Sequence, residues 1–427
     1  MRLRLSLLMA LVYAVQGAFW PLLAVHLKDL GISGFERGWI FATCAIASVA
    51  VPLGAGQLVD RFMAGEKLLA LIYVVAAGFL VAMARGQATS AWSIFALFMF
   101  FWMVTAPAFA LSNVVALRHL RWPHRDFGKV RLWGTFGWMA VGWIVSLVMA
   151  WSGGAGSGRG AFEAFWVAAA IALILAMYSL TLPHTPPLLN RDARPAGFAD
   201  ALRLARRPGM GVFLITALCV HMTTPFIFQV MPTYFEARGL PRSWISTVMT
   251  IGQWPEIAML ASLPWMFERI GPKGTLSLGI AAWIIRYATL ALDPPLWLAI
   301  AGIPLHGVGI ACFTVAGQVY TDSQADPDRR ASAQALYMVV TSGMGSLLGS
   351  LLAGDLVARH AGDYARVFLV PCVIDMALLV YFWKGFRASA RVGERAVAPN
   401  TVRPLRDDAV RGPVVRIGNL VTEPADG

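Results

Sequence analysis

Charged residues are scarce in this sequence. Asp, Glu, Lys and Arg make up 14% of its 427 residues, whereas about 25% is typical of soluble proteins. A soluble chain of this length would need at least two domains with polar surfaces, and so few charges cannot cover them. The scarcity of charge therefore excludes an ordinary soluble protein.

The sequence also lacks the motifs of common catalytic sites. It has no Gly-x-x-x-x-Gly-Lys-Ser/Thr loop, so ATP-driven pumping has no support. It has no metal-ligand spacing and no nucleophile elbow. Its four cysteines lie inside apolar runs, without a Cys-x-x-Cys pair or a Cys/His cluster. We therefore expect no enzyme, no metal and no other cofactor.

Long apolar runs dominate instead. Hydrophobic residues are 58% of the chain, and a run of roughly 18 or more of them can cross the hydrocarbon core as a helix. In lipid the backbone must satisfy its own hydrogen bonds, which favours helices. The sequence predicts an all-α membrane protein with about twelve transmembrane helices, at 5–27, 38–59, 67–85, 91–116, 131–151, 163–182, 210–235, 243–267, 274–292, 296–320, 331–357 and 365–384.

The first run resembles a signal peptide, because Arg2 and Arg4 precede it. It continues to Leu27, however, and no small-x-small cleavage site closes a short apolar segment. We read it as a retained first transmembrane helix.

The net charge of +12 could suggest a nucleic-acid partner, but its distribution argues against one. With the N-terminus inside, the inner segments before the last helix carry eighteen Lys and Arg residues, and the outer loops carry eight. This bias is typical of membrane topology. We expect an inner-membrane protein with both termini in the cytoplasm, surrounded by lipid, with no nucleic acid and no obligate protein partner.

A Pro- and Arg-rich break divides the runs into six and six. We predict an N-terminal six-helix bundle at 1–185, a central cytoplasmic loop at 186–208, a C-terminal six-helix bundle at 209–388 and a disordered cytoplasmic tail at 389–427. Acidic–basic pairs follow the second helix of each half, at Asp60–Arg61 and Glu268–Arg269. They are consistent with two repeats related by an axis along the membrane normal.

Few ionisable residues lie inside the runs, and such residues usually face a cavity or a partner. Glu256 lies near the middle of the predicted helix 243–267, with Gln253 on the same helical face. A carboxyl group at this depth can carry a proton, so Glu256 is the candidate for proton coupling, and a structural hydrogen-bonded carboxyl is the alternative.

A second cluster opens the predicted helix 131–151. Arg131, Thr135 and Trp138 recur at i, i+4 and i+7 and share one face. A guanidinium, a hydroxyl and an aromatic plate can bind a polar ring by hydrogen bonding and stacking. Arg131 alone could equally be a positively charged anchor at the inner surface.

Four other polar residues lie in apolar sequence. Arg286 and Asp375, both at about mid-depth, could form a structural ion pair. His306 and Gln229 either contact a solute or bridge helices.

The layout resembles the major facilitator superfamily. Within it, the chain is similar to the nucleoside:proton symporters over nearly its whole length except the tail. The resemblance lies in Phe127-Gly128-Lys129-Val130-Arg131-Leu132-Trp133-Gly134-Thr135, Gln253-x-x-Glu256, Ala282-Trp283-Ile284-Ile285-Arg286 and Arg330-Ala331-Ser332-Ala333-Gln334.

The resemblance implies proton-coupled uptake of nucleosides by alternating access. It implies nucleoside contacts at Arg131, Thr135, Gln253 and Glu256, with Glu256 coupled to the proton and an aromatic expected at Trp138. Phenylpropionate-type permeases share the Gly-Lys-Val-Arg-Leu-Trp-Gly segment, so a permease for an aromatic or small organic acid is the alternative. Arg131 would then pair with the solute carboxylate. A membrane receptor or scaffold without transport is a third possibility.

Overall fold

The computed structural model describes residues 1–54, 63–153, 160–186, 205–207, 209–326 and 329–387. The regular structure in these residues is helical. The first half contains α1 (Arg2–Phe19), η1 (Trp20–Leu22), α2 (Leu23–Asp29), α3 (Gly34–Gly54), α5 (Gly65–Ala84), α6 (Ala91–His119), α7 (Pro123–Trp151) and α8 (Phe162–Ser179).

The second half contains more, shorter elements. They are α10 (Met210–Thr223), α11 (Phe226–Gln229), α12 (Met231–Ala237), α13 (Arg242–Met249), η2 (Thr250–Gly252), α14 (Gln253–Arg269), α15 (Gly271–Ala291), α16 (Leu296–Ala301), α17 (Pro304–Gly309), η3 (Ile310–Val315), α18 (Ala316–Gln324), α19 (Arg330–Met338), η5 (Val339–Gly345), α20 (Ser346–Arg359) and α21 (Tyr364–Gly385).

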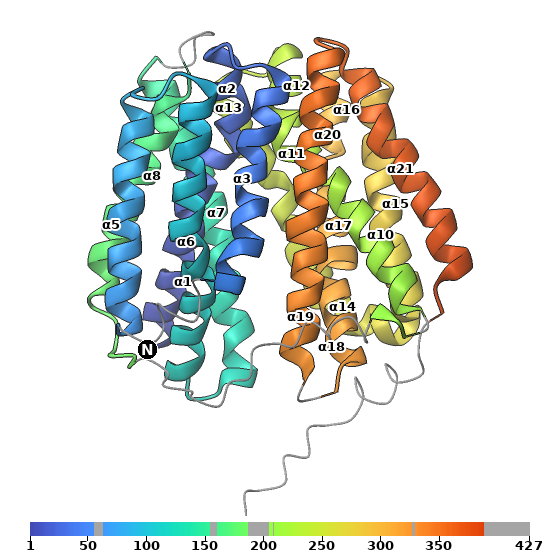
Figure 1. Ribbon diagram of the computed structural model, residues 1–427, viewed down its shortest axis with the longest axis horizontal. Helices are drawn as coiled ribbons and strands as arrows, with labels where there is room; N and C mark the ends of the chain where they lie inside the picture. Colours follow the sequence, from blue (N-terminus) through green and yellow to red (C-terminus); the bar gives the residue numbers. More distant parts are fainter. Residues whose placement is uncertain (55–62, 154–159, 187–204, 208, 327–328, 388–427) are drawn as a thin grey trace, which may run out of the picture.

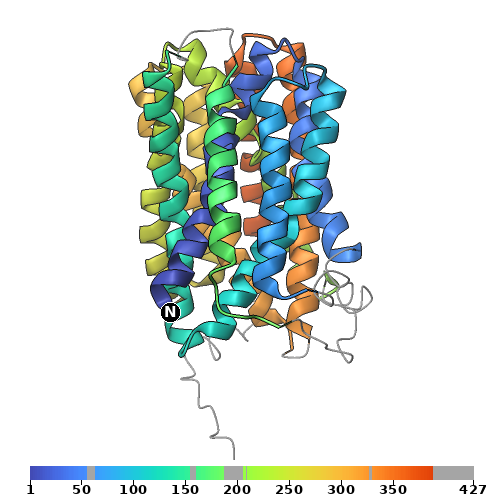
Figure 2. The same ribbon diagram turned by 90° about the vertical axis from the view of Figure 1, so that its left-hand side faces the viewer.

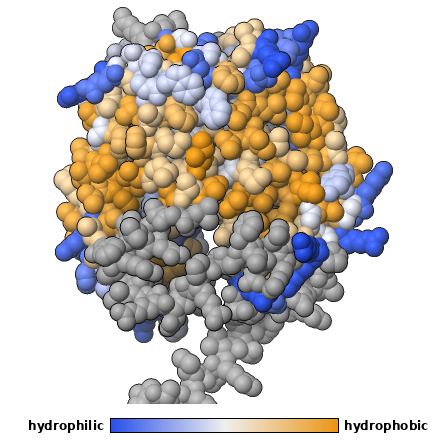
Figure 3. Space-filling model, in the orientation of Figure 1, coloured by the Kyte–Doolittle hydropathy of each residue, from blue (hydrophilic) through white to orange (hydrophobic). Residues whose placement is uncertain are grey.

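These elements confirm the predicted all-α membrane fold. Ten helical segments of the described chain are long and apolar enough to cross a bilayer. The two other predicted crossings are α3 and the run from α13 to α14, which pack alongside these ten. The middle of the surface is a broad hydrophobic belt, and the hydrophilic side chains gather toward the two ends (Figure 3).

The crossings form two groups that stand side by side (Figure 1). The first contains α1 to α8, and the turned view shows its helices running the height of the molecule (Figure 2). The second contains α10 to α21. The boundaries of the two bundles, at 1–185 and 209–388, stay predictions. Most of the predicted loop 186–208 and all of the predicted tail 389–427 lie outside the described residues.

The two ends of the molecule differ in how the groups meet. We call the end where the chain begins the near end, and the end with the turns Leu30–Ser33 and Ala361–Asp363 the far end. Toward the far end α3 packs on α20 and α7 packs on α13. Toward the near end the ribbons of the two groups stand apart (Figure 1).

Small residues allow the close contact of α3 with α20. A Cβ atom added at Gly354 would lie 2.7 Å from the carbonyl oxygen of Gly34 and 2.7 Å from the Cα of Gly38. Small residues at such spacing let helix backbones approach within a membrane. The far-end contact between the two groups therefore depends on the absence of side chains here.

Several crossings of the second half are interrupted. The seventh breaks around Pro225 and Val230, and the eighth passes through the 3₁₀ turn Thr250–Gly252. Single π-helical turns interrupt the tenth, at Ile310–Val315, and the eleventh, at Val339–Gly345. Interrupted helices and π turns are frequent at functional sites, so these breaks indicate the level at which a site should be sought.

The start of α7 corrects one predicted boundary. We expected a helix from residue 131, but α7 begins at Pro123, whose fixed φ suits the first helical position. Arg131 therefore lies about two helical turns inside α7.

Candidate functional site

Arg131 projects from α7 onto a residue of α1. Its guanidinium carbon lies 4.1 Å from the centre of the Tyr13 ring, a cation–π geometry. Gly134 is one turn further along α7 and leaves room for both groups. In the described part of the chain, Arg131 has no ion-pair or hydrogen-bond partner.

Glu256 faces this pair from the other half of the molecule. It lies in the first turn of α14, close enough to Arg131 and to Tyr13 for its charge to act on both. Glu256 is half-buried and, like Arg131, has no ion-pair or hydrogen-bond partner among the described residues. The two halves thus present opposite, unpaired charges to each other.

Gln253 lies one turn before Glu256 and is buried. With its amide nitrogen turned toward its own helix, it donates to the carbonyl oxygens of Thr250 at 2.9 Å and Met249 at 3.2 Å. This orientation fixes the side chain across the 3₁₀ turn and leaves its carbonyl oxygen as an acceptor.

A series of aromatic contacts connects α7 with the second half of the molecule. The Trp138 ring lies 6.1 Å from that of Phe228 in α11, and Phe228 lies 6.2 Å from the ring of His306 in α17. Trp20 in η1 also contacts Phe228, at 6.4 Å. Phe228 therefore connects aromatic groups of both halves at the interface.

His306 also packs against the start of α14. A Cβ atom at Gly252 would lie 3.1 Å from the His306 ring, and one at Gly307 would collide with the backbone at Gly252 and Glu256. The close packing of α17 on α14 thus holds His306 next to the turn that carries Gln253. The structure brings together five predicted residues: Arg131, Trp138, Gln253, Glu256 and His306.

Two other predicted site residues are less closely connected. Thr135 is half-buried on the Arg131 face of α7, and among the described residues no side-chain hydrogen bond connects it to the cluster. Gln229 is 2% exposed and donates to the carbonyl oxygen of Ser350 at 3.1 Å, so it bridges α11 and α20. Its geometry is that of a helix-bridging amide, one of the two readings that the sequence left open.

The predicted ion pair between Arg286 and Asp375 is wrong. Arg286 donates to the carbonyl oxygen of Ile303 at 3.3 Å and contacts the sulfur of Met231 at 2.8 Å. Asp375 instead accepts from the hydroxyl of Thr223, at 3.2 Å. The two residues lie on packed helices, α15 and α21, but their side chains turn toward different neighbours. The sequence predicts how deep each residue lies in the membrane, but not toward which neighbouring helix its side chain points.

Sequence reasoning missed Tyr13 and the role of Phe228. A tyrosine in an apolar first helix is an ordinary core residue by pattern, and no spacing connects it with Arg131. Phe228 belongs to a segment that the sequence presented as one continuous helix, whereas the structure breaks it on both sides. Only the packing of distant segments reveals either contact.

A charge cluster closes the far end between the halves. Arg242 at the start of α13 pairs with both Asp29 of α2 and Glu236 of α12, and Glu236 also accepts from Lys28 at 2.9 Å. Arg242 is 4% exposed and Asp29 5%. Below this level, Thr247 donates to Ser146 at 2.8 Å and Trp143 to Thr250 at 3.2 Å. These links join the halves above the Arg131–Glu256 level.

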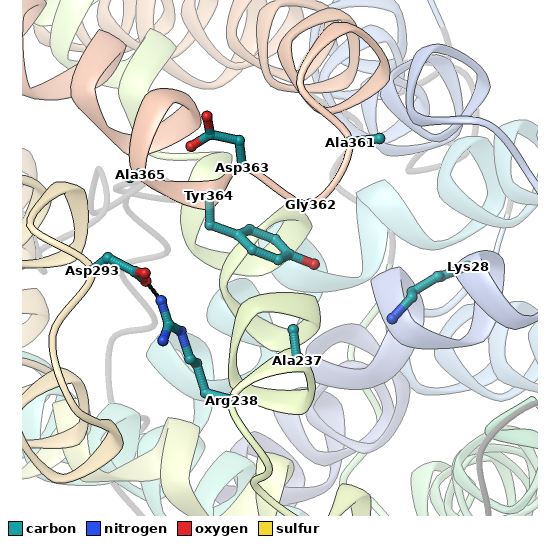
Figure 4. A pocket seen from close by; sticks show the side chains of 9 residues that line it. All are labelled: Lys28, Ala237, Arg238, Asp293, Ala361, Gly362, Asp363, Tyr364 and Ala365. Atoms are coloured by element: carbon teal, nitrogen blue, oxygen red, sulfur yellow. Dashed lines mark ion pairs between the residues drawn. The ribbon is translucent and has the colours of Figure 1, made fainter.

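One pocket of about 800 Å³ opens at the far end, away from the predicted site (Figure 4). Lys28 comes from the first half, and the other lining residues come from the second. Its charges are matched, since Lys28 pairs with Glu236, Arg238 with Asp293 and Asp363 with Arg366. In the described part of the chain, no group of His, Cys, Asp and Glu has the arrangement of a metal site.

Two groups of membrane-spanning helices, interrupted helices and unpaired opposite charges between the groups in the described part of the chain define a secondary transporter of the major facilitator architecture. The comparisons with known proteins agree with this class. The sequence model of the family described as nucleoside H⁺ symporter matches residues 1–391, and the chain belongs to this family. It is not an enzyme.

Several relatives match over most of their length. YegT of Escherichia coli K12 is 30% identical over 365 residues, which are 83% of this chain and 84% of YegT. The nucleoside permease NupG of the same strain is 24% identical over 91% of this chain and 96% of its own. The crystal structure of the nucleoside transporter NupG has the same fold, with a TM-score of 0.80 over 91% of this chain and 99% of that one.

Proposed function

We propose that this protein takes up nucleosides together with protons by alternating access. The observation that carries the proposal is the placement of Arg131 and Glu256 within electrostatic reach of each other across the two halves. Neither residue has an ion-pair or hydrogen-bond partner in the described part of the chain. Membership of the nucleoside H⁺ symporter family supports both the solute class and the proton.

The groups at the site suit a nucleoside. Its hydroxyls and the polar edge of its base can accept hydrogen bonds from the Arg131 guanidinium, which presents five N–H donors. Its flat base can stack on an aromatic plate such as Trp138. The Gln253 carbonyl oxygen and the Glu256 carboxyl add acceptors from the other half. The solute would therefore contact both halves at once.

Glu256 is suited to couple the proton. An ionised Glu256 attracts Arg131 across the interface, and a proton removes that attraction. Protonation thus changes the charge between the halves at the place where the solute binds. This difference between the loaded and empty carrier can bias their relative movement.

The distribution of Lys and Arg supports one orientation in the membrane. With Lys and Arg enriched at the near end, that end faces the cytoplasm and both termini lie inside. The far end then faces outward, and the Arg242 cluster closes it. We infer that the structure is the inward-facing state of an inner-membrane transporter, with the far-end pocket as the outer vestibule.

Competition identifies the solute class. In vesicles containing the purified protein and an inward proton gradient, we expect excess uridine, adenosine or xanthosine to reduce uptake of a labelled nucleoside by about tenfold or more. Phenylpropionate should leave uptake unchanged. Inhibition by phenylpropionate alone would contradict nucleoside as the solute. It would indicate an aromatic acid, whose carboxylate Arg131 would bind.

Far-end closure should depend on Gly354. The Gly354→Leu variant would drive a side chain into the backbone of α3, so we expect uptake near background and a far end held open. Spin labels at Thr89 and Ala361 should report a longer distance across the far end. Gly78→Leu is the matched control, because a Cβ atom there meets nothing within 4 Å. Equal distances in both variants would contradict this account.

A further inference from the structure

The aromatic ring of Tyr13 lies beneath the Arg131 guanidinium, and the role that we assign to it rests on the proposed function of Arg131. We propose that Tyr13 is a positioning residue, whose ring holds the Arg131 guanidinium in the orientation that binds the nucleoside. The two groups come from α1 and α7, and the ring centre lies 4.1 Å from the guanidinium carbon.

The surroundings fix the Tyr13 ring from the other side. Phe109 of α6 meets it edge to face, with the ring centres 5.0 Å apart and the planes at 74°. Such T-shaped pairs are a favoured aromatic geometry. The ring is therefore held between an aromatic edge and the guanidinium, and it cannot turn away without losing both contacts.

The backbone of α7 is adapted to this stack. A Cβ atom at Gly134 would lie 2.8 Å from Cδ2 of Tyr13 and 3.0 Å from an Nη atom of Arg131. Any larger residue would displace the ring, the guanidinium or both. Further along, Gly137 packs directly on the backbone of Ala10. This close packing of α1 on α7 fixes the position of the Tyr13 ring relative to Arg131.

The stack also explains how Arg131 stays available. In the described part of the chain the guanidinium has no ion-pair partner, although the Glu256 carboxyl lies within electrostatic reach. An arginine is long and flexible, and a free one would move toward that carboxylate. A planar guanidinium stacked on a ring keeps its N–H edges free for hydrogen bonds. Tyr13 thus holds the Arg131 guanidinium in place without using its N–H donors.

The test compares three variants in the uptake assay. Tyr13→Phe keeps the ring, and we expect a half-saturating nucleoside concentration close to wild type. Tyr13→Leu removes the ring, and we expect that concentration to rise roughly 2- to 30-fold, the range of a cation–π contact, at an unchanged maximal rate. Gly134→Ala should also raise it. Thermal unfolding of each purified variant in detergent checks that it is folded.

A double variant separates positioning from direct contact. In an Arg131→Gln background, adding Tyr13→Leu should change the half-saturating concentration no further, because the ring acts through the arginine. An additive effect, or a loss in Tyr13→Phe as large as in Tyr13→Leu, would overturn the inference. If Arg131→Gln alone leaves nucleoside uptake unchanged, the proposed site itself fails. If Arg131→Gln weakens uptake and Tyr13→Leu does not, only the role of Tyr13 fails.

Discussion

The Glu256→Gln variant should lose all nucleoside accumulation driven by a proton gradient while it still exchanges nucleoside. Glutamine keeps the size and hydrogen-bonding capacity of the side chain but cannot take up or release a proton. Accumulation in vesicles with an acidic outside should therefore fall to the level of protein-free vesicles. Exchange of labelled for unlabelled nucleoside, without a gradient, should persist, because the carrier can still move with its solute.

Glu268→Gln is the matched control for that experiment. Glu268 lies on the same helix, α14, but is exposed near its end. Removing its charge should leave accumulation unchanged. Undiminished accumulation by Glu256→Gln at acidic outside pH would eliminate Glu256 as the coupling carboxyl. Loss of exchange as well would instead indicate that Glu256 is needed for solute binding.

The Arg242→Gln variant should shift the protein toward the outward-open state. Arg242 compensates two carboxylates, Asp29 and Glu236, in a nearly buried cluster. Breaking a buried ion pair by removing one partner costs about 3–5 kcal/mol. The closed far end loses that stabilisation, so its population relative to the open state should fall by roughly two to four orders of magnitude. Distances between spin labels at Thr89 and Ala361 report the change.

Arg359→Gln is the control for this prediction. Arg359 is also at the far end, but it is 71% exposed and pairs with Asp355 one turn earlier in α20, at 2.8 Å. Its loss removes one positive charge without breaking a link between the halves. We expect wild-type distances in this control. If Arg242→Gln also shows wild-type distances, the cluster does not hold the far end closed.

The sequence predicted the crossings well because lipid imposes a simple rule on them. Long uncharged runs must be helical, and most predicted ends lie within a few residues of the structure. The exception is α7, which begins at Pro123 rather than at residue 131. Arg125, Asp126 and Lys129 made its first two turns look like a loop, although Arg2 pairs with Asp126 there.

The site was only partly predictable, because sequence gives the depth of a residue better than its direction. Glu256 and Arg131 stood out as charges in apolar sequence. Arg286 and Asp375 stood out equally, yet their side chains turn to Ile303 and Thr223. Tyr13 gave no signal, because its importance comes from the packing of α1 against α7. Such contacts depend on helix rotation, which apolar runs in lipid leave undetermined.

The most direct test of the account is proton entry driven by nucleoside. The purified protein is placed in vesicles that enclose a pH-sensitive dye, at equal pH on both sides, and uridine or adenosine is added outside. We expect acidification of the interior that depends on nucleoside and is absent in the Glu256→Gln variant. Nucleoside entry without acidification, or acidification that only an aromatic acid produces, would contradict it.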